Sequence, residues 1–352
     1  MRSLALALLV ALGLWGWPPA LSLALPHAHA RPGTPDRLDR FRELATTRLG
    51  AEQLLDSERP HEAHRDLYAL LDEEIVESLA SGSVFASTGF LQERLDAFGE
   101  AWGGAHFSLM PVGRMFVGAF ALGNTGNSIR IYGRLRDEAA LLATMYRDGR
   151  PAVYTLPAAG SGHFVAAWEG APSGRGTRAL RVELVRPQPE SVQVMWSTAD
   201  VFPDGLLARG YTLKGGDLRV RYEVHYPGWT PGCGGQTEQE DVYRLAPSGA
   251  TFARVSRQEH DAWHRSFRGA VARVFAALAV GDQPALATLV PDKDLRARLP
   301  ALVPEPACDA QEGSGHDAVS VAAAAADHRP WTLTFRRAGT LWRLTAASPV
   351  LH

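Results

Sequence analysis

Two histidines are spaced so that they could share a metal ion. His260 and His264 stand four residues apart, and in a helix this spacing places both rings on one face. Asp261 or Glu259 would then supply a further ligand. The segment lacks the HExxH pattern, in which a glutamate activates a zinc-bound water, and the competing interpretation is a solvated first helical turn. Because a metal site needs more ligands than this pair provides, no metal is assigned.

The segment from Pro227 to Asp241 contains residue types that are common in ligand-binding loops. Trp229 would supply a flat apolar contact, and Glu238, Glu240 and Asp241 would supply polar contacts. If the segment is extended, the two glutamates share one strand face and the aspartate lies on the other. The competing and favoured interpretation is a structural crossover between strands, whose acids are solvated or protect a sheet edge.

Cys233 and Cys308 are the two cysteines of the chain. An even number of cysteines in an exported protein predicts a disulfide, and both stand among loop-forming glycines or prolines. Neither belongs to a CxxC pair, so a zinc or redox role is not indicated. The bridge would close a long loop and stabilise the fold by roughly 4–5 kcal/mol. No segment has a specific catalytic or cofactor motif, so neither a catalytic residue nor a cofactor is predicted.

Residues 1–30 have the pattern of a secretory signal peptide. Arg2 precedes an apolar run over Leu4–Trp17, and the segment ends in Ala28-His29-Ala30. This pattern predicts cleavage after Ala30 and a secreted or periplasmic protein. A membrane anchor is the alternative, but the run is shorter than the roughly 20 apolar residues that span a bilayer. We therefore expect no stable membrane span after processing.

The composition indicates a folded protein without a nucleic-acid footprint. Of the 352 residues, 46% are hydrophobic, which provides a real core and argues against wholesale disorder. The net charge is −2 at pH 7, so no basic excess would attract nucleic acid or an anionic membrane.

Residues 31–106 are predicted to form a helical segment that packs on a following sheet. Helical spacing runs from Leu67 to Leu79, and Gly82 lies just past its end. A second apolar stripe runs from Leu91 to Trp102.

Residues 107–257 have the pattern of antiparallel strands. Leu218–Tyr226 alternates apolar and polar residues without error, and Tyr211–Leu213 would pair with it across a glycine turn. Glu138–Tyr146 is open between a short helix and the first arm of a hairpin that turns at Asp148-Gly149. The remaining strand candidates are Met115–Leu122, Ser128–Tyr132, Ala152–Leu156, Phe164–Trp168, Arg178–Leu184, Val192–Ser197, Val242–Leu245 and Phe252–Ser256.

Residues 258–352 are predicted to form a helix-plus-sheet module. An apolar stripe from Phe267 to Leu278 predicts a helix that ends at Gly281, and Asp282 and Asp292 are predicted N-caps of two short helices. The chain then ends in a hairpin, whose first strand contains Trp331, Leu333 and Phe335 and whose second contains Trp342, Leu344 and Ala346.

This last region resembles the NTF2-like (cystatin-like, SnoaL-type) α+β cone. The resemblance rests on the segments 274–282, 284–292, 331–335 and 341–344 and covers about a quarter of the chain. It implies an α+β module, in which the last two of these segments are paired strands. Only three good strands are evident, whereas the family usually has more. The common Asp, His and Tyr positions of its enzymes have no counterpart here, and the family includes enzymes and non-catalytic modules alike, so no site is carried over.

Together these observations predict an α+β protein with a helical start, an antiparallel β-rich middle and a small C-terminal module. The predicted function is an exported, non-enzymatic binding or scaffold protein that recognises a protein or an envelope polymer. The alternatives are a hydrolase whose acids come from separated loops and a structural envelope protein. A deep pocket with converging polar groups would favour the hydrolase, and an exposed aromatic patch would favour binding.

Overall fold

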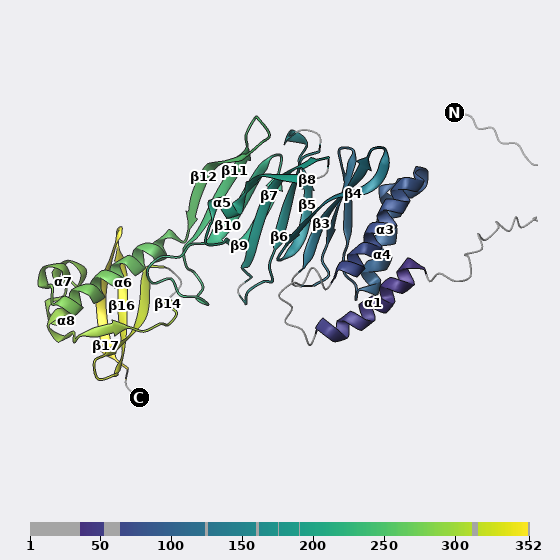
Figure 1. Ribbon diagram of the computed structural model, residues 1–352. Coiled ribbons are helices and arrows are strands. Elements are labelled where there is room, and N and C mark those ends of the chain that lie inside the picture. Colours follow the sequence, from purple (N-terminus) through teal and green to yellow (C-terminus); the bar gives the residue numbers. More distant parts are fainter. Residues whose placement is uncertain are drawn as a thin grey trace, which may run out of the picture. The chain divides into compact units, whose positions relative to one another are not determined.

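The computed structural model describes residues 36–52, 64–123, 126–159, 162–174, 176–189, 191–311 and 316–350. The fold is mixed α+β and its strands form three antiparallel sheets (Figure 1). The elements below belong to the unit formed by residues 37–352. The predicted signal peptide lies outside the described residues. Within the described part of the chain, no helix is long and apolar enough to cross a membrane.

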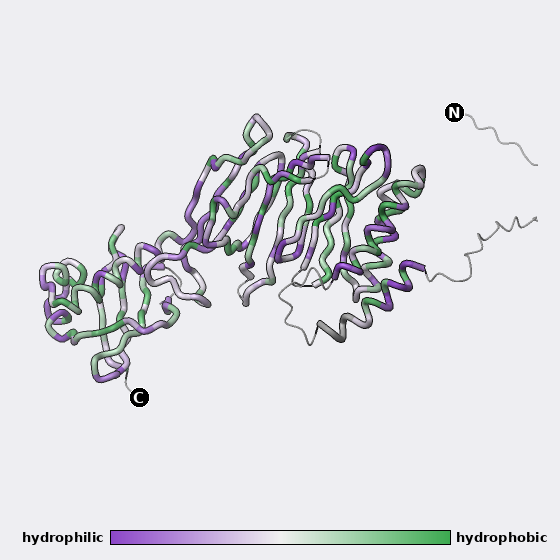
Figure 2. Tube along the Cα trace, viewed as in Figure 1, coloured by the Kyte–Doolittle hydropathy of each residue, from purple (hydrophilic) through white to green (hydrophobic). Residues whose placement is uncertain are grey.

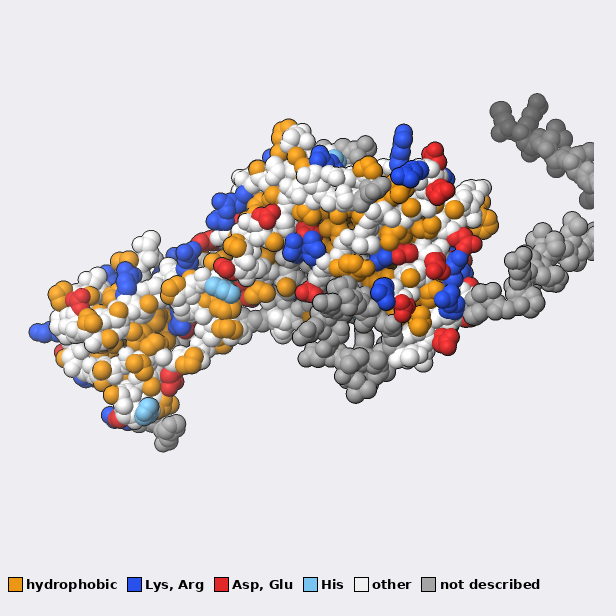
Figure 3. All heavy atoms as spheres, viewed as in Figure 1, with side chains coloured by type: hydrophobic (Ala, Val, Ile, Leu, Met, Phe, Trp, Pro, Cys, Tyr) orange, Lys and Arg blue, Asp and Glu red, His pale blue; other side chains and the backbone are white. Residues whose placement is uncertain are grey.

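Helices precede the first sheet. Their bounds are α1 (Arg37–Glu52), α3 (Arg65–Ser81), the 3-10 turn η1 (Ser83–Ala86) and α4 (Thr88–Ala101). The two predicted helices are confirmed as α3, which ends just before Gly82, and α4, which begins after the N-cap Ser87. Leu71 and Phe98 from these helices are fully buried with Phe120 and Tyr132 from the following strands. Basic and acidic side chains are interspersed over the helices (Figure 3), and Arg37 reaches Glu74 at 3.2 Å.

The first sheet has the strand order β1-β2-β3-β4. Its strands are β1 (Ser108–Val112), β2 (Met115–Phe120), β3 (Asn127–Leu135) and β4 (Glu138–Arg147). The segment Glu138–Tyr146, which the sequence leaves open, is therefore a strand. Its partner is β3 rather than the strand after Asp148-Gly149, because Arg136 and Asp137 both adopt positive φ and make the tight turn themselves.

The second sheet has eight strands in the order β12-β11-β10-β9-β7-β6-β5, with β8 paired to β7. Its strands are β5 (Arg150–Thr155), β6 (Phe164–Glu169), β7 (Arg178–Gln188), β8 (Ser191–Ser197), β9 (Leu207–Lys214), β10 (Asp217–Glu223), β11 (Glu238–Leu245) and β12 (Phe252–His260). The short helix α5 (Thr198–Val201) follows β8. The alternation on β10 is confirmed, although the strand ends at Glu223 rather than at Tyr226. The predicted pairing of β9 with β10 is confirmed as well.

The two faces of β6 contribute to different cores. Val165 and Ala167 pack in one apolar cluster with the inward side chains of β7, β9, β10 and β11. Ala166 and Trp168 pack in another cluster with Ile131 and other residues of the first sheet. Figure 2 shows hydrophobic and hydrophilic residues mixed along these strands, as expected when successive side chains point to opposite faces.

The C-terminal helices and strands share a third core. The helices are α6 (Ala262–Val280), α7 (Gln283–Leu289) and α8 (Lys293–Arg298). The strands are β13 (Leu302–Pro304), β14 (Ala310–Gln311), β15 (Ala318–Ala325), β16 (Pro330–Ala338) and β17 (Leu341–Pro349). The stop at Gly281, the caps Asp282 and Asp292 and the final hairpin are all confirmed. Phe267 and Phe335 are fully buried where α6 packs on this sheet.

Candidate functional site

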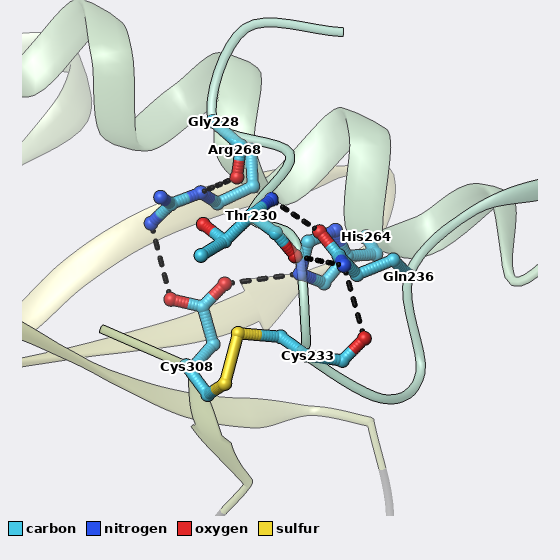
Figure 4. Close-up of a disulfide and its surroundings, with 8 residues drawn as sticks. Gly228, Thr230, Cys233, Gln236, His264, Arg268 and Cys308 are labelled. Atoms are coloured by element: carbon cyan, nitrogen blue, oxygen red, sulfur yellow. Dashed lines mark hydrogen bonds and ion pairs between the residues drawn. A yellow bond between two sulfur atoms is a disulfide. The ribbon is translucent and has the colours of Figure 1, made fainter. Parts of the chain in front are cut away.

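The predicted disulfide is confirmed. Cys233 and Cys308 are bonded, with their Cα atoms 5.2 Å apart, so the loop after β10 is tied to the segment before β14 (Figure 4). Gln236 holds the same loop from inside, because its amide accepts from the Thr230 N–H and donates to the Thr230 and Cys233 carbonyls. The loop is therefore held both by a covalent bond and by hydrogen bonds.

A buried polar cluster lies beside the disulfide (Figure 4). His264 places Nδ1 2.6 Å from the Tyr226 hydroxyl and Nε2 3.0 Å from the Asp309 carboxylate. Arg268 donates to the other oxygen of Asp309 at 3.1 Å and to the Gly228 carbonyl at 2.9 Å. Each of these polar groups is paired, so the cluster joins α6 to the loop without leaving an unsatisfied charge.

The premise of the histidine metal site is wrong. His260 is the last residue of β12, and Asp261 turns the chain in a left-handed conformation before α6 begins at Ala262. The two rings therefore do not lie one turn apart on a helix. His260 approaches Glu240 at 3.7 Å, whereas His264 belongs to the cluster above. Among the described residues, no group of three possible ligands converges on one point.

Trp229 lies in the loop, whereas the three acids lie on β11. Trp229 is partly exposed, and its ring packs against His225 at an interplanar angle of 31°, with ring centroids 3.9 Å apart. Glu238 is buried between Arg209 at 2.6 Å and Arg221 at 2.5 Å. The loop thus presents an aromatic pair, whereas the Glu238 carboxylate already forms ion pairs with two guanidinium groups.

Glu240 and Asp241 are also engaged with arginines, on opposite faces of β11. Glu240 reaches Arg219 at 2.5 Å, on the side of Glu238, which confirms the predicted alternation. Asp241 is fully buried and accepts from Arg257 at 2.9 Å. Burial acts to raise the pKa of Asp241, but hydrogen bonding and the positive charge of Arg257 outweigh it and lower that pKa. The proposed binding role of Trp229, Glu238, Glu240 and Asp241 stays a prediction.

A polar cleft lies in a region without a recognisable sequence motif. Two contiguous hollows of about 720 and 290 Å³ share Tyr154, Glu169 and Arg178, and the smaller also contains Tyr211. We call these four residues the tyrosine cleft. The Tyr154 and Tyr211 hydroxyls are 2.8 Å apart, Tyr211 donates to Glu169 at 3.0 Å, and Arg178 donates to the other Glu169 oxygen at 2.5 Å. Burial and the hydrogen bond with Tyr154 raise the pKa of Tyr211, so its hydroxyl is protonated at neutral pH.

A second cleft of about 770 Å³ lies next to it. Five of its residues define what we call the arginine cleft: Arg147, Trp168, Arg181, Phe202 and Leu206. Gly149 and Gly170 line both this cleft and the larger polar hollow. Neither cleft is evident from the sequence, because its residues come from separate strands. The one available signal was a charged residue, Glu169, directly after the apolar run of β6.

No protein-family model and no curated protein sequence matches this chain. Among solved structures, it is similar to a mutant of the Aleuria aurantia lectin in complex with Fucα1-6GlcNAc. The identity is 12% and the TM-score 0.20, over 67% of this chain and 57% of the lectin. It is also similar to a proposed 6-phosphogluconolactonase of Bacteroides uniformis, with 11% identity and a TM-score of 0.19, over 70% of this chain and 74% of that one. TM-scores this low establish neither a shared fold nor a function.

Proposed function

We propose that this chain is an exported binding protein that holds a hydroxyl-rich polymer, such as an envelope glycan, in the tyrosine cleft. The observation that carries the proposal is the chain of hydrogen bonds from Tyr154 through Tyr211 and Glu169 to Arg178. These side chains come from β5, β9, β6 and β7, so four neighbouring strands position them rigidly.

The chemistry of the cleft suits sugar hydroxyls. A sugar hydroxyl donates and accepts hydrogen bonds, and the cleft offers a carboxylate that accepts, a guanidinium that donates and phenols that do both. The Tyr154 and Tyr211 rings meet edge to face, with centroids 6.2 Å apart, and add apolar surface. His106, Ser108 and other polar residues extend the lining beyond this core.

The arrangement supports binding more than the hydrolase alternative. Glycoside hydrolysis uses two carboxyl groups on either side of the scissile bond. Within the described residues, Glu169 is the one carboxylate that lines the two polar hollows, and it is already bonded to Arg178 and Tyr211. A carboxylate held in this way orients a ligand rather than transferring a proton.

A secreted or periplasmic location is part of the proposal. The disulfide supports it, because such bonds persist in oxidising compartments. We also keep as a proposal that residues 258–352 resemble an NTF2-like module. The long helix α6 packed on an antiparallel five-stranded sheet supports that resemblance.

Affinity gel electrophoresis with dextran, xylan and polygalacturonate tests the proposed function. At least one polysaccharide should retard the protein, and Tyr211→Phe or Arg178→Gln should weaken the retardation about tenfold by removing a link in the chain of hydrogen bonds. Tyr243→Phe is the matched control, since Tyr243 lies on the same sheet but bonds Asp241 outside the cleft. If no polysaccharide retards the folded protein, or if Tyr211→Phe behaves as the parent, the proposal is overturned.

The loop of Trp229 is a second candidate contact surface, for a protein or polymer partner. Its specific support is the packed His225–Trp229 ring pair on a loop that the disulfide already fixes, so little ordering entropy is lost on binding. Trp229→Ala should weaken capture of such a partner by roughly 1–3 kcal/mol while the thermal midpoint stays near that of the parent. A large fall in that midpoint would instead assign Trp229 to the core.

A further inference from the structure

The arginine cleft has a charged end built around a carboxylate that does not face the solvent. Glu183 is fully buried on β7. Its Oε1 accepts from Arg181 at 2.7 Å and from Arg147 at 3.3 Å, and its Oε2 accepts from the Trp168 indole N–H at 3.2 Å. One carboxylate therefore holds two guanidinium groups, from β4 and β7, in fixed positions at the cleft wall.

These guanidinium groups remain available to a ligand. The side chains of Arg147 and Arg181 are 33% and 41% exposed, whereas Glu183 behind them is not exposed at all. Each guanidinium has five N–H donors. The bonds to Glu183 and to the Tyr146 carbonyl use only some of these donors, so the others can bond a ligand. A pair of arginines fixed in this way matches the oxygens of a carboxylate or phosphate.

The cleft also has apolar walls. Its walls include Leu180, Phe202, Pro203 and Leu206. Leu180 and Leu206 are buried, whereas Phe202 is partly exposed and Pro203 is exposed. A cleft that combines apolar walls with cationic groups is suited to an amphiphile.

We propose that the arginine cleft binds an anionic amphiphile, with the head group on Arg147 and Arg181 and the apolar chain against Phe202 and Leu206. The volume of about 770 Å³ lies within the range of roughly 300–1,000 Å³ that is usual for small-molecule sites. Asp148 also lines the cleft, but it is exposed to solvent and lies in the turn after β4. This second site is independent of the glycan proposal, since its polar side chains lie on the other face of β6 and β7.

Isothermal titration calorimetry of the full chain tests this site with dodecanoate and dodecyl phosphate, each below its critical micelle concentration, and with dodecanol below its solubility limit. Both anionic probes should bind at least tenfold more tightly than dodecanol, and the tighter of the two identifies the head group. Arg181→Gln should weaken dodecanoate at least tenfold and leave dodecanol unchanged. Arg186→Gln, an exposed arginine of the same strand, is the matched control and should change neither.

A second variant covers the possibility that Arg181→Gln disturbs the fold through Glu183. Ala199 is exposed and lines the cleft without contacting the ion pair, so Ala199→Trp should fill the cleft and abolish binding of dodecanoate. The proposal is overturned if the folded parent does not bind dodecanoate, if dodecanol binds equally well, or if Ala199→Trp binds like the parent. Tyr211→Phe should leave dodecanoate affinity unchanged, which separates this result from any failure of the glycan proposal.

Discussion

The two faces of β6 and β7 use the same residue types for opposite purposes. Glu169 pairs with Arg178 on one face and Glu183 pairs with Arg181 on the other, at 2.5 and 2.7 Å. The Glu169 side chain is 25% exposed and lines its cleft, whereas Glu183 is completely buried behind the arginines that it holds. The two carboxylates therefore differ in burial and not in residue type. The partly exposed Glu169 can contact a ligand directly, whereas the buried Glu183 only holds the arginines that would do so.

Glu183→Gln should produce the largest effect on stability. The change removes the charge that pairs two arginines and leaves an amide within their reach. Breaking a fully buried ion pair costs about 3–5 kcal/mol, and because these arginines are partly exposed we expect a loss of about 2–3 kcal/mol in the free energy of unfolding. Urea unfolding measures it. A loss below that of Glu169→Gln would contradict the assignment of Glu183 as the supporting carboxylate.

Gly149→Ala should weaken ligand binding in both clefts, because Gly149 lines both of them. Its φ is +94°, and an added Cβ would lie 2.8 Å from the Glu169 backbone. The strain should cost about 2 kcal/mol and weaken both glycan and dodecanoate binding. Gly339→Ala is the control, since Gly339 also has a positive φ but an added Cβ there would have no atom within 4 Å. If only one ligand is affected, the two clefts do not share this wall.

Asp241 should make the tyrosine face sensitive to acid. It lies in register with Val220, which in turn faces Tyr211, so it belongs to the same side of the sheet. Its pKa is lowered in the fold, so its contribution is complete above the unfolded value of about 3.9 and is lost as the pH falls through the lower folded value. Urea midpoints from pH 7 to pH 2 should fall below about pH 4. Asp241→Asn should lose about 1–2 kcal/mol at pH 7 and show a smaller fall.

Glu169→Gln should have the smallest effect on stability and a clear effect on binding. The pair of Glu169 with Arg178 is partly exposed, so its removal should cost less than about 1 kcal/mol. Polysaccharide retardation should nevertheless decrease, because the glutamine amide keeps one acceptor oxygen and so cannot accept from both Tyr211 and Arg178. The same urea and gel experiments apply, and unchanged retardation would show that the cleft does not use this carboxylate.

Local patterns were sufficient to predict much of the fold. The apolar spacing of α3, α4 and α6, the caps Asp282 and Asp292 and the alternation of β10 depend on neighbouring residues, and all were confirmed. The disulfide followed from the presence of just two cysteines in a chain whose start has the pattern of an export signal. The strand β15 was missed, because its alanine-rich sequence has low β-propensity and forms a strand only between its partners.

Features that join distant strands could not be predicted. Tyr154 and Tyr211 are separated by 57 residues and meet only after β5, β6, β7 and β9 are assembled in that sheet. The histidine pair failed for a related reason. The apolar stripe of α6 indicates a helix but not its first residue, and the strand β12 extends to His260 through its pairing with β11.

The strand β12 forms one end of the eight-stranded sheet, and this position has a consequence for self-association. An end strand offers unpaired backbone groups that a strand from a second molecule could extend into a fibre. Arg254, Arg257 and Glu259 are exposed along β12, so a second strand would have to bury charged side chains to pair there. Replacing these residues by valine or threonine would remove that barrier, and the sheet would become a template for aggregation.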